Sequence, residues 1–208
     1  MIKITDLTIK YNNKLVIDRI SFNVLDRKCI VLFGPSGCGK TSILNAIANL
    51  ISYQGIIDLD GKVSYCFQNH KLFKRLSVID NLLLTCNDNF KIVQYLEKFE
   101  LKGFENVLVN DLSEGQKARV NIIRSLISND ILLLDEPFAS LDLELKKKVM
   151  DVIKEEISNK KGTILVTHDI DEAQYLGDEV LYIKEKTSCN CPEILSDFKQ
   201  CIVKEFDI

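Results

Sequence analysis

A glycine-rich segment in the first part of the chain has the residue types and spacing that hold phosphate groups. Residues 34–41 fit the pattern G-x-x-x-x-G-K-[ST], with a buried strand expected before them and a helix after. Glycines let the backbone wrap tightly, so that successive N–H groups and the helix N-terminus point at phosphate oxygens. Lys40 adds charge at the β and γ phosphates, and Thr41 offers a hydroxyl to Mg²⁺. We expect the following residues to contact a nucleotide: Gly34, Pro35, Ser36, Gly37, Cys38, Gly39, Lys40, Thr41 and Ser42.

Two adjacent carboxylates follow a second apolar run. Asp135 and Glu136 come directly after residues 131–134, where Asp135 can face magnesium and Glu136 the attacking water. The same residues can also be a solvated exit from a strand, but the phosphate loop upstream favours the catalytic interpretation. No Asn-Lys-x-Asp motif, which would read guanine, occurs in the sequence.

The segments around these motifs indicate an α/β fold. The apolar run 29–33 suits a strand buried on both faces, and a helix is expected over 41–50. A helix over 143–158 then joins the strand at 131–134 to another at 163–166. Parallel strands joined by helices predict one α/β sheet.

Other segments of the chain show different patterns. Apolar and polar residues alternate in 2–4, 7–9 and 20–24, which predicts half-buried strands, with a turn at Asn12 and Asn13. Asp60 and Gly61 separate two short strand-like runs and predict a tight hairpin. Leu and Ile recur at helical spacing through 69–130, which indicates a helical insertion. The tail from about 185 is expected to add a final strand or helix.

Composition excludes several classes of protein. Hydrophobic residues make up 46% of the chain and charged residues 27%, as in a soluble globular protein. The net charge of −3 supplies no basic field for nucleic acid. Without a long apolar run or signal peptide, we expect a cytoplasmic protein. The seven cysteines lack paired spacing and are expected to be reduced thiols, with a metal at Cys189, Cys191 and Cys201 as the weaker alternative.

Residues 112–116 carry a family resemblance. Leu-Ser-Glu-Gly-Gln resembles the signature sequence of ABC transporter ATP-binding subunits. Tyr11, Gln68, Asp142 and His168 occur along the chain in the order that the family shows. The resemblance implies a P-loop NTPase fold with a RecA-like core, an N-terminal antiparallel β-subdomain and an inserted α-helical subdomain. It implies a single ABC ATPase domain over 1–208. The core would comprise 1–68 and 131–208, and the helical signature subdomain 69–130.

The resemblance also implies roles for single residues in cis. Tyr11 would stack on adenine, unless it is an ordinary exposed tyrosine at a strand end. Gln68 would contact magnesium and water, and His168 would bond the γ-phosphate. Together with Glu136, these two residues would be catalytic, while Thr41, Gln68 and Asp135 would hold Mg²⁺.

A second group of residues would act on ATP bound to another subunit. The resemblance places Ser113, Gly115, Gln116 and Asp142 at this trans site, although Asp142 can equally be the N-cap of the following helix. Two departures from the family pattern stand out. Glu114 replaces the usual glycine and would repel a nearby triphosphate unless its side chain points away, and the segment between Lys40 and Gln68 is shorter than usual.

The function implied is Mg²⁺-dependent ATP hydrolysis in a head-to-tail dimer that drives solute through a separate membrane permease. The partners would be a second copy or a paired ABC subunit, the permease subunits, and a solute-binding protein, with no nucleic acid. The chain would lie peripherally on the cytoplasmic face of the cell membrane. Residues 69–78 would dock the permease, although Leu72, Phe73 and Leu76 can equally belong to the core.

The chain looks most similar to importer subunits of the nitrate, sulfonate, taurine or thiamine kind. Two alternatives remain at this point. One is an ATPase acting on ribosomes or DNA, which would normally show fused cassettes, a coiled-coil insertion or a basic arm. The other is a silent regulatory module, which would lack the Glu or the His that this sequence retains at 136 and 168.

Overall fold

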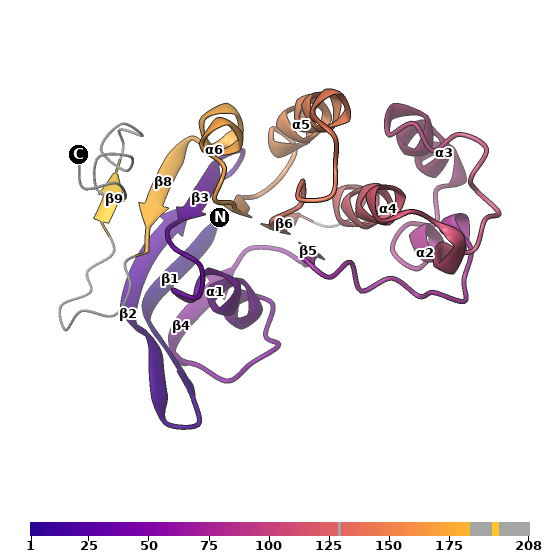
Figure 1. Cartoon of the computed structure of the whole chain (residues 1–208). Coiled ribbons are helices and arrows are strands. Elements are labelled where there is room, and N and C mark those ends of the chain that lie inside the picture. Colours follow the sequence, from indigo (N-terminus) through magenta and orange to yellow (C-terminus); the bar gives the residue numbers. More distant parts are fainter. Residues whose placement is uncertain (129, 184–192, 196–208) are drawn as a thin grey trace.

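The computed structural model describes residues 1–128, 130–183 and 193–195, and contains two sheets and a helical region (Figure 1). The strands are β1 (Ile2–Tyr11), β2 (Lys14–Val24), β3 (Cys29–Phe33), β4 (Gln54–Leu59), β5 (Val63–Cys66), β6 (Ile131–Asp135), β7 (Thr163–Val166), β8 (Glu179–Tyr182) and β9 (Glu193–Leu195). The helices are α1 (Lys40–Ile47), α2 (Val78–Leu83), α3 (Asn89–Lys98), the 3-10 turn η1 (Val109–Asp111), α4 (Glu114–Leu126), α5 (Leu143–Ile157) and α6 (Ile170–Leu176).

The smaller sheet is antiparallel, with the order β2-β1-β4. Its first hairpin turns at Asn12 and Asn13, whose φ angles are 46° and 63°, and Tyr11 pairs with Lys14 across the turn. Positive φ at both central residues is typical of a type I′ turn, which asparagine tolerates well. The turn predicted from the sequence is confirmed.

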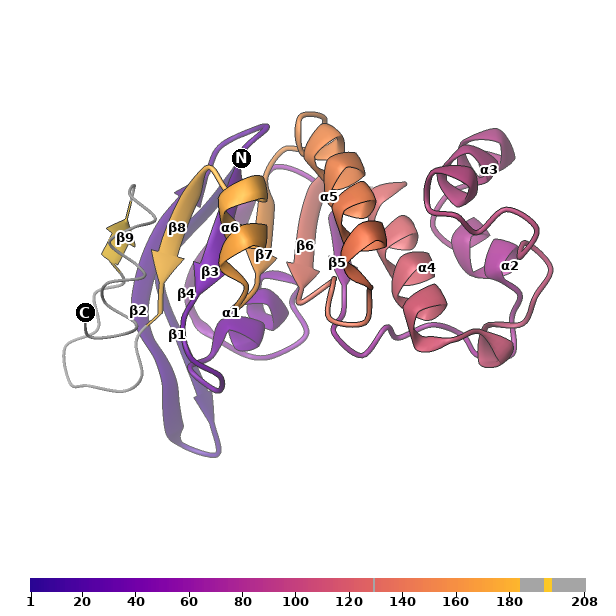
Figure 2. The same cartoon turned by 45° about the horizontal axis from the view of Figure 1, so that its top comes forward.

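The larger sheet carries the polar motifs at one edge. Its order is β5-β6-β7-β3-β8-β9, and its first five strands are parallel while β9 is antiparallel to β8. Figure 2 shows these strands side by side, with α6, α5 and α4 in front of them. Parallel strands end on the same edge of a sheet, so the segments after β3, β5, β6 and β7 lie close together.

The two faces of the parallel sheet contact different cores. On β6, Ile131 and Leu133 face the cluster formed with α1 and the antiparallel sheet, whereas Leu132 and Leu134 face the cluster formed with α2 to α6. All four side chains are fully buried. Strands covered on both faces are expected to be continuously apolar, which explains the uninterrupted runs in β3 and β6.

The predicted hairpin at Asp60 and Gly61 is wrong. The chain does turn there, but β4 pairs with β1 in the antiparallel sheet and β5 pairs with β6 in the parallel one. After the turn, the backbone N–H and C=O of Lys62 bond to the side chain and N–H of Asp130. This contact directs β5 to a partner distant in sequence, which a local turn motif cannot indicate.

Residues 78–126 contain the predicted helices α2, α3 and α4, which lie at the end of the molecule away from the β1–β2 hairpin (Figure 1). Helix α4 holds the turn that follows β5. Asn121 Nδ2 donates to the carbonyl of Phe67 at 2.8 Å, and Arg124 donates to the carbonyls of His70 and Lys71 at 3.0 and 2.9 Å. The last two residues have positive φ angles of 51° and 44°, so these bonds fix a strained turn.

The remaining expectations concern cysteines, the tail and membrane spans. Cys29, Cys38, Cys66 and Cys86 are free thiols, as predicted. Cys189, Cys191 and Cys201 lie outside the described part of the chain, as does most of the tail. The described part of the tail from 185 is β9, which agrees with the strand or helix expected there. Within the described ranges, the helices are all too short or too polar to span a bilayer.

The packing of β6 generates a stability prediction. Leu133→Ala removes most of a fully buried side chain beside α1 and should lower the free energy of unfolding by about 2–5 kcal/mol. Leu143→Ala is the matched control, because Leu143 is 85% exposed and its replacement should cost less than about 0.5 kcal/mol. Urea unfolding of both variants measures the difference, and equal losses would contradict this description of the core.

Candidate functional site

A cavity of about 450 Å³ lies beside the phosphate loop, a size typical of ligand sites. It combines residues from β1, β2, the loop, α1 and the segments that follow β5 and β6. Its lining consists of Tyr11, Val16, Ser36, Gly37, Gly39, Lys40, Thr41, Ser42, Gln68 and Glu136. Most residues expected to bind the nucleotide in cis therefore meet in one place.

The phosphate loop owes its shape to two close approaches. Gly34 and Gly39 have φ angles of 144° and 107°, in the region that favours glycine. A Cβ atom would lie 2.3 Å from the carbonyl oxygen of Ile183 at Gly34, and 2.7 Å from Ile17 Cδ1 at Gly39. Gly39 is also the N-cap of α1 and has no capping side chain. The N–H groups of the first helical turn thus lack a side-chain acceptor, as suits an anion site.

Lys40 is almost fully buried within this loop. Its Nζ donates to the carbonyl oxygens of Gly34 and Pro35 at 2.6 and 2.8 Å. Cys38 Sγ lies 3.8 Å from the same nitrogen, and burial raises the pKa of this thiol. Gly34, Pro35 and Cys38 shape the loop and hold the lysine, and are not among the residues that line the cavity.

Tyr11 closes the cavity from the side of β1. Its hydroxyl lies 3.5 Å from Ser42 Oγ, and the residue is 43% exposed. An exposed aromatic ring beside the phosphate loop can accept a planar base on its face. Tyr11 therefore lines the cavity beside the phosphate loop, and its stacking on adenine stays a prediction.

Asp135 lies at the buried end of β6, and each of its carboxylate oxygens accepts a hydrogen bond. Thr41 Oγ1 donates to Oδ1 at 3.1 Å, and the Tyr65 hydroxyl lies 3.3 Å from Oδ2. Burial raises the pKa of Asp135, although these two hydrogen bonds act in the opposite direction. The sequence pattern thus positions a carboxylate against the hydroxyl of the phosphate loop.

The three residues predicted to be catalytic lie in contact, with Glu136 between Gln68 and His168. Gln68 Nε2 donates to Glu136 Oε2 at 2.9 Å, and His168 Nδ1 lies 3.5 Å from Oε1. Glu136 itself has a φ angle of 45°, which is rare for a residue with a side chain. Strained backbone concentrates at functional sites, so this angle strengthens Glu136 as a candidate. The segments that follow three different strands, β5, β6 and β7, supply these side chains.

The residues predicted to act in trans lie elsewhere. Ser113 is the N-cap of α4, where Ser113 Oγ accepts from the Gln116 N–H at 3.2 Å and Gln116 Oε1 accepts from the Ser113 N–H at 2.9 Å. Gly115 lies close to the carbonyl of Ser140. Asp142 caps α5 by accepting from the Leu145 N–H at 3.0 Å, so its predicted capping role is confirmed. Within the described residues, none of the four predicted trans residues lines the cavity beside the phosphate loop.

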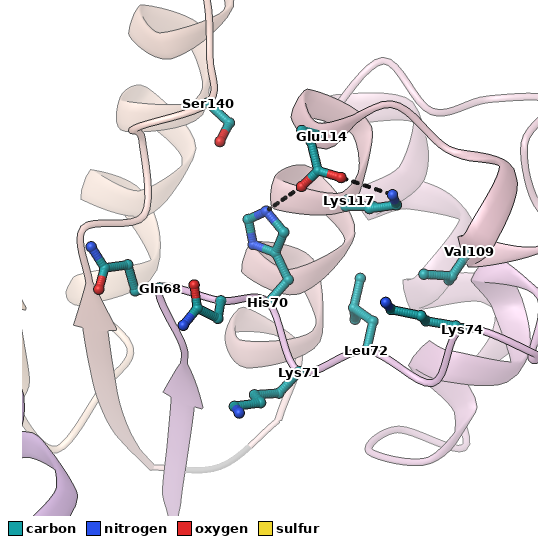
Figure 3. A pocket seen from close by; sticks show the side chains of 10 residues that line it. Gln68, His70, Lys71, Leu72, Lys74, Val109, Glu114, Lys117 and Ser140 are labelled. Atoms are coloured by element: carbon teal, nitrogen blue, oxygen red, sulfur yellow. Dashed lines mark hydrogen bonds and ion pairs between the residues drawn. The ribbon is translucent and has the colours of Figure 1, made fainter.

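Glu114, the departure from the family signature, has one cation, Lys117, and the imidazole of His70 close to its carboxylate. Its carboxylate bonds to Lys117 Nζ at 2.8 Å and lies 3.7 Å from His70 Nε2 (Figure 3). The hydrogen bond from Lys117 lowers the pKa of Glu114. The side chain therefore faces a second pocket, which Gln68, Leu72 and Lys74 also line. The repulsion expected at Glu114 is reduced by these partners.

The segment predicted to dock a permease divides into buried and exposed parts. Leu72 packs against the core and Leu76 is half-buried, whereas Phe73 is 58% exposed. The core alternative therefore holds for Leu72, and Phe73 is the apolar side chain available for contact.

The residues around Asp135 are suited to Mg²⁺. This ion prefers oxygen ligands and is usually held by one or two protein oxygens together with substrate phosphates. The Thr41 hydroxyl and the Asp135 carboxylate lie in contact next to the phosphate loop, which matches that requirement. Gln68 directs its amide nitrogen toward Glu136, and its carboxamide oxygen is the atom that would approach a metal.

Tyr65 is a functional candidate that the sequence did not reveal. Its ring stacks on Phe67 with centroids 4.0 Å apart, and its hydroxyl lies 3.2 Å from Asn45 Oδ1 as well as near Asp135. The available signal was a hydroxyl-bearing aromatic residue in a strand that alternates buried and half-buried positions, where the hydroxyl needs a partner. Reading β5 as a hairpin arm concealed the fact that β6, with Asp135, lies next to it.

The phosphate loop before α1, with the two carboxylates at the end of β6, defines a nucleoside triphosphatase of the P-loop class. A profile described as "ABC transporter" matches residues 17–139. The aliphatic sulfonates import ATP-binding protein SsuB of Bacillus subtilis (strain 168) is 38% identical over 187 residues, which cover 82% of this chain and 73% of that protein. The chain belongs to the ABC transporter family and is an ATP-hydrolysing cassette.

Further relatives agree with this assignment. The spermidine/putrescine import ATP-binding protein PotA of Desulfitobacterium hafniense (strain Y51) is 35% identical over 208 residues, covering 89% of this chain and 60% of that protein. The dimeric structure of MJ0796, a bacterial ABC transporter cassette, has a TM-score of 0.79 to this chain at 27% identity. The alignment covers 88% of this chain and 94% of the MJ0796 chain. A dimeric post-hydrolysis structure of MJ0796 bound to ADP and Pi has a TM-score of 0.79 at 25% identity, covering 94% and 99%. The predicted fold class and ATPase activity are confirmed.

The raised pKa of Asp135 generates a prediction about pH and stability. The folded chain binds this proton more tightly than the unfolded chain, so ionisation of Asp135 lowers stability as the pH rises above the ordinary value of 3.8. Asp135→Asn keeps an acceptor for Thr41 and cannot ionise. It should therefore be more stable than the wild type at pH 7 without nucleotide, with the gain shrinking as the pH falls.

Urea unfolding at a series of pH values measures this gain. Asp58→Asn, which changes an exposed carboxylate on β4, is the matched control and should show no comparable gain. A gain at Asp135 that does not depend on pH, or a loss of stability at pH 7, would contradict the assignment of burial as the dominant effect.

Proposed function

We propose that this chain is the Mg²⁺-dependent ATPase subunit of an importer for a small solute, and that two cassettes work together on a separate membrane permease. The names of its relatives support import, since both are import ATP-binding proteins. The dimeric cassette structures that resemble the chain support pairing. The proposed location is the cytoplasmic face of the membrane, in contact with the permease. A solute-binding protein that delivers cargo is part of the proposal.

The observation that carries the proposal is the position of Glu136. Its carboxylate lies at the cavity beside the phosphate loop and is contacted from two sides, by Gln68 and by His168. A silent regulatory module would not need a carboxylate, an amide and an imidazole together beside a phosphate site. The arrangement instead supports hydrolysis, in which a water must be oriented and deprotonated.

The chain's residues divide the work of hydrolysis. The N–H groups at the start of α1 and the ammonium of Lys40 bind the phosphate oxygens, and Tyr11 contacts the base. A magnesium ion held by Thr41 and Asp135, with Gln68 close to it, would neutralise phosphate charge. Glu136 orients the attacking water and accepts its proton, while His168 donates a hydrogen bond to the γ-phosphate. Low solvent access in a closed site strengthens each of these contacts.

The completed site requires a second chain. Ser113, Gly115 and Gln116 begin α4, whose N-terminus carries the partial positive charge that attracts phosphate, yet they do not line the cavity of their own chain. A head-to-tail pair would bring this terminus over the partner's ATP, with Asp142 in the interface. In such a pair, hydrolysis opens the interface, and the helices of 69–130 transmit the movement to the permease.

The choice of solute is assigned to the permease. Sulfonates are anions and polyamines are cations, yet cassettes serving both resemble this chain to a similar degree, at 38% and 35% identity. The cassette sequence therefore does not follow the charge of the cargo. Residues 69–78 form the proposed docking segment, with Phe73 as its exposed apolar contact.

Glu136→Gln is the first test of this function. Loss of the base should lower the rate of ATP hydrolysis by about 10²–10⁴-fold while the fold and ATP binding persist. The variant should also accumulate as a dimer in ATP and Mg²⁺, as measured by light scattering. Glu97→Gln, an exposed carboxylate on α3, is the control. A wild-type rate would remove Glu136 from the role of base, and a chain that stays monomeric would count against the pair.

A mixing experiment tests the head-to-tail arrangement. Lys40→Met should abolish the cis site, and Ser113→Asp should abolish the trans site by adding a carboxylate while preserving the N-cap. Each variant alone should be inactive. In a mixed pair one site contains both lesions and the other contains neither, so an equal mixture should recover up to about a quarter of the wild-type rate. A mixture as inactive as its components would contradict the arrangement.

A further inference from the structure

Lys146, on the second turn of α5, contacts the segment that carries His168. Its Nζ lies 2.5 Å from Asp169 Oδ2 and 2.5 Å from Glu172 Oε1. The side chains of Lys146 and Glu172 are only 16% and 8% exposed, so this ion pair is largely shielded from water. Burial disfavours the charge of Lys146, but its hydrogen bonds to the two carboxylates outweigh this effect and raise its pKa. One ammonium thus joins two carboxylates of the same segment.

The two carboxylates fix the backbone on both sides of His168. Glu172 Oε2 accepts from Thr167 Oγ1 at 2.5 Å, and Thr167 Oγ1 in turn accepts from the Asp169 N–H at 3.0 Å. Asp169 Oδ1 caps α6 by accepting from the N–H groups of Asp171 and Glu172. His168 itself is 71% exposed at its side chain and has Glu136 as its recorded polar neighbour. Its position therefore depends on the residues beside it.

The same lysine connects this segment to the start of α5. The backbone N–H of Lys146 donates to the carbonyl of Asp142 at 2.8 Å, one helical turn earlier. Asp142 is the N-cap residue that the proposed function places in the interface with a second chain. A continuous set of contacts thus runs from Asp142 through Lys146 to both neighbours of His168.

We propose that Lys146 is a positioning residue for ATP hydrolysis: its ammonium ties the segment 167–172 to α5 and so holds His168 against Glu136. The inference rests on the proposed function, in which His168 bonds the γ-phosphate. Lys146 is not among the residues that line the described cavity, and its ammonium bonds to Asp169 and Glu172. It should therefore affect turnover through geometry, and leave the binding of ATP largely intact.

The variant that tests the proposal must separate position from stability. Lys146→Met alone leaves a buried carboxylate without its cation, which is expected to destabilise the fold. Lys146→Met/Glu172→Gln restores the charge balance and leaves Thr167 an acceptor, but removes the tie to α5. Lys146→Arg keeps the cation and should restore the tie. Lys148→Met, on the same helix with 51% side-chain exposure and partners Glu100 and Glu144, is the matched control.

Two readouts are measured on the full chain. Hydrogen–deuterium exchange follows the amides of 167–172, which should exchange faster in Lys146→Met/Glu172→Gln than in the wild type. Steady-state kinetics should show kcat lowered roughly tenfold or more, with KM for ATP changed less than about threefold. The thermal midpoint of this double variant should stay close to that of the wild type. Lys146→Arg and Lys148→Met should retain wild-type exchange and turnover.

The outcomes distinguish this proposal from the function on which it rests. Wild-type exchange or wild-type kcat in Lys146→Met/Glu172→Gln would overturn the positioning role, as would a loss in Lys146→Arg equal to that of the double variant. Full turnover in His168→Ala would instead contradict the proposed role of His168. An inactive His168→Ala beside a fully active double variant would leave the proposed function standing and overturn the inference alone.

Discussion

The parallel pairing of β5, β6, β7 and β3 determines where chemistry can take place in this chain. The phosphate loop follows β3, Gln68 follows β5, Glu136 follows β6 and His168 follows β7. Hydrogen bonds between these strands hold their carboxyl ends at one edge, so four segments that are distant in sequence converge. A shift of one residue in register would turn each side chain to the opposite face of the sheet. The apolar runs that fill both cores therefore also set the geometry of the polar site.

Asp135 shows what this arrangement costs. A carboxylate at the end of an apolar strand is disfavoured by burial, and Thr41 and Tyr65 only partly offset the effect. Under the proposed function, this carboxylate supplies the negative charge that a divalent cation beside phosphate needs. Functional sites often reduce the stability of the free protein in this way. The strained backbone at Glu136, one residue later, fits the same pattern.

Much of the fold and the site could be predicted from sequence, because both depend on short motifs and apolar runs that can be recognised without knowing which distant segments are in contact. The phosphate loop has fixed spacing between its glycines and Lys40, and the strand at 131–135 is a continuous apolar run. Contacts between segments distant in sequence escaped prediction. The turn at Gly61 is local and predicts a hairpin for β5, whereas the true partner is β6, where Ile131 pairs with Val63.

Whether the role of a single residue could be predicted also depended on how far along the chain its contacts lie. Tyr65 became visible only when its neighbour was known, and Lys146 carries no motif of its own. Charge alone made Glu114 look repulsive, because its partners His70 and Lys117 depend on how α4 meets the turn after β5. Capping was the exception: Asp142 was predicted as an N-cap from its position before a helix, and is one.

The bonds from α4 to that turn have a mechanical meaning. Asn121 and Arg124 donate to three carbonyls of the turn, those of Phe67, His70 and Lys71, so the helix and the turn should move as one body. Ser113 lies at the N-terminus of α4, and Gln68 is next to Phe67, whose carbonyl accepts from Asn121 of the same helix. If the helix and the turn rotate as a rigid body, the N-terminus of α4 and the turn after β5 move together. If Ser113 contacts ATP on a partner chain as proposed, a movement of this end of α4 would also displace Gln68, and the two sites would be coupled through the helix itself.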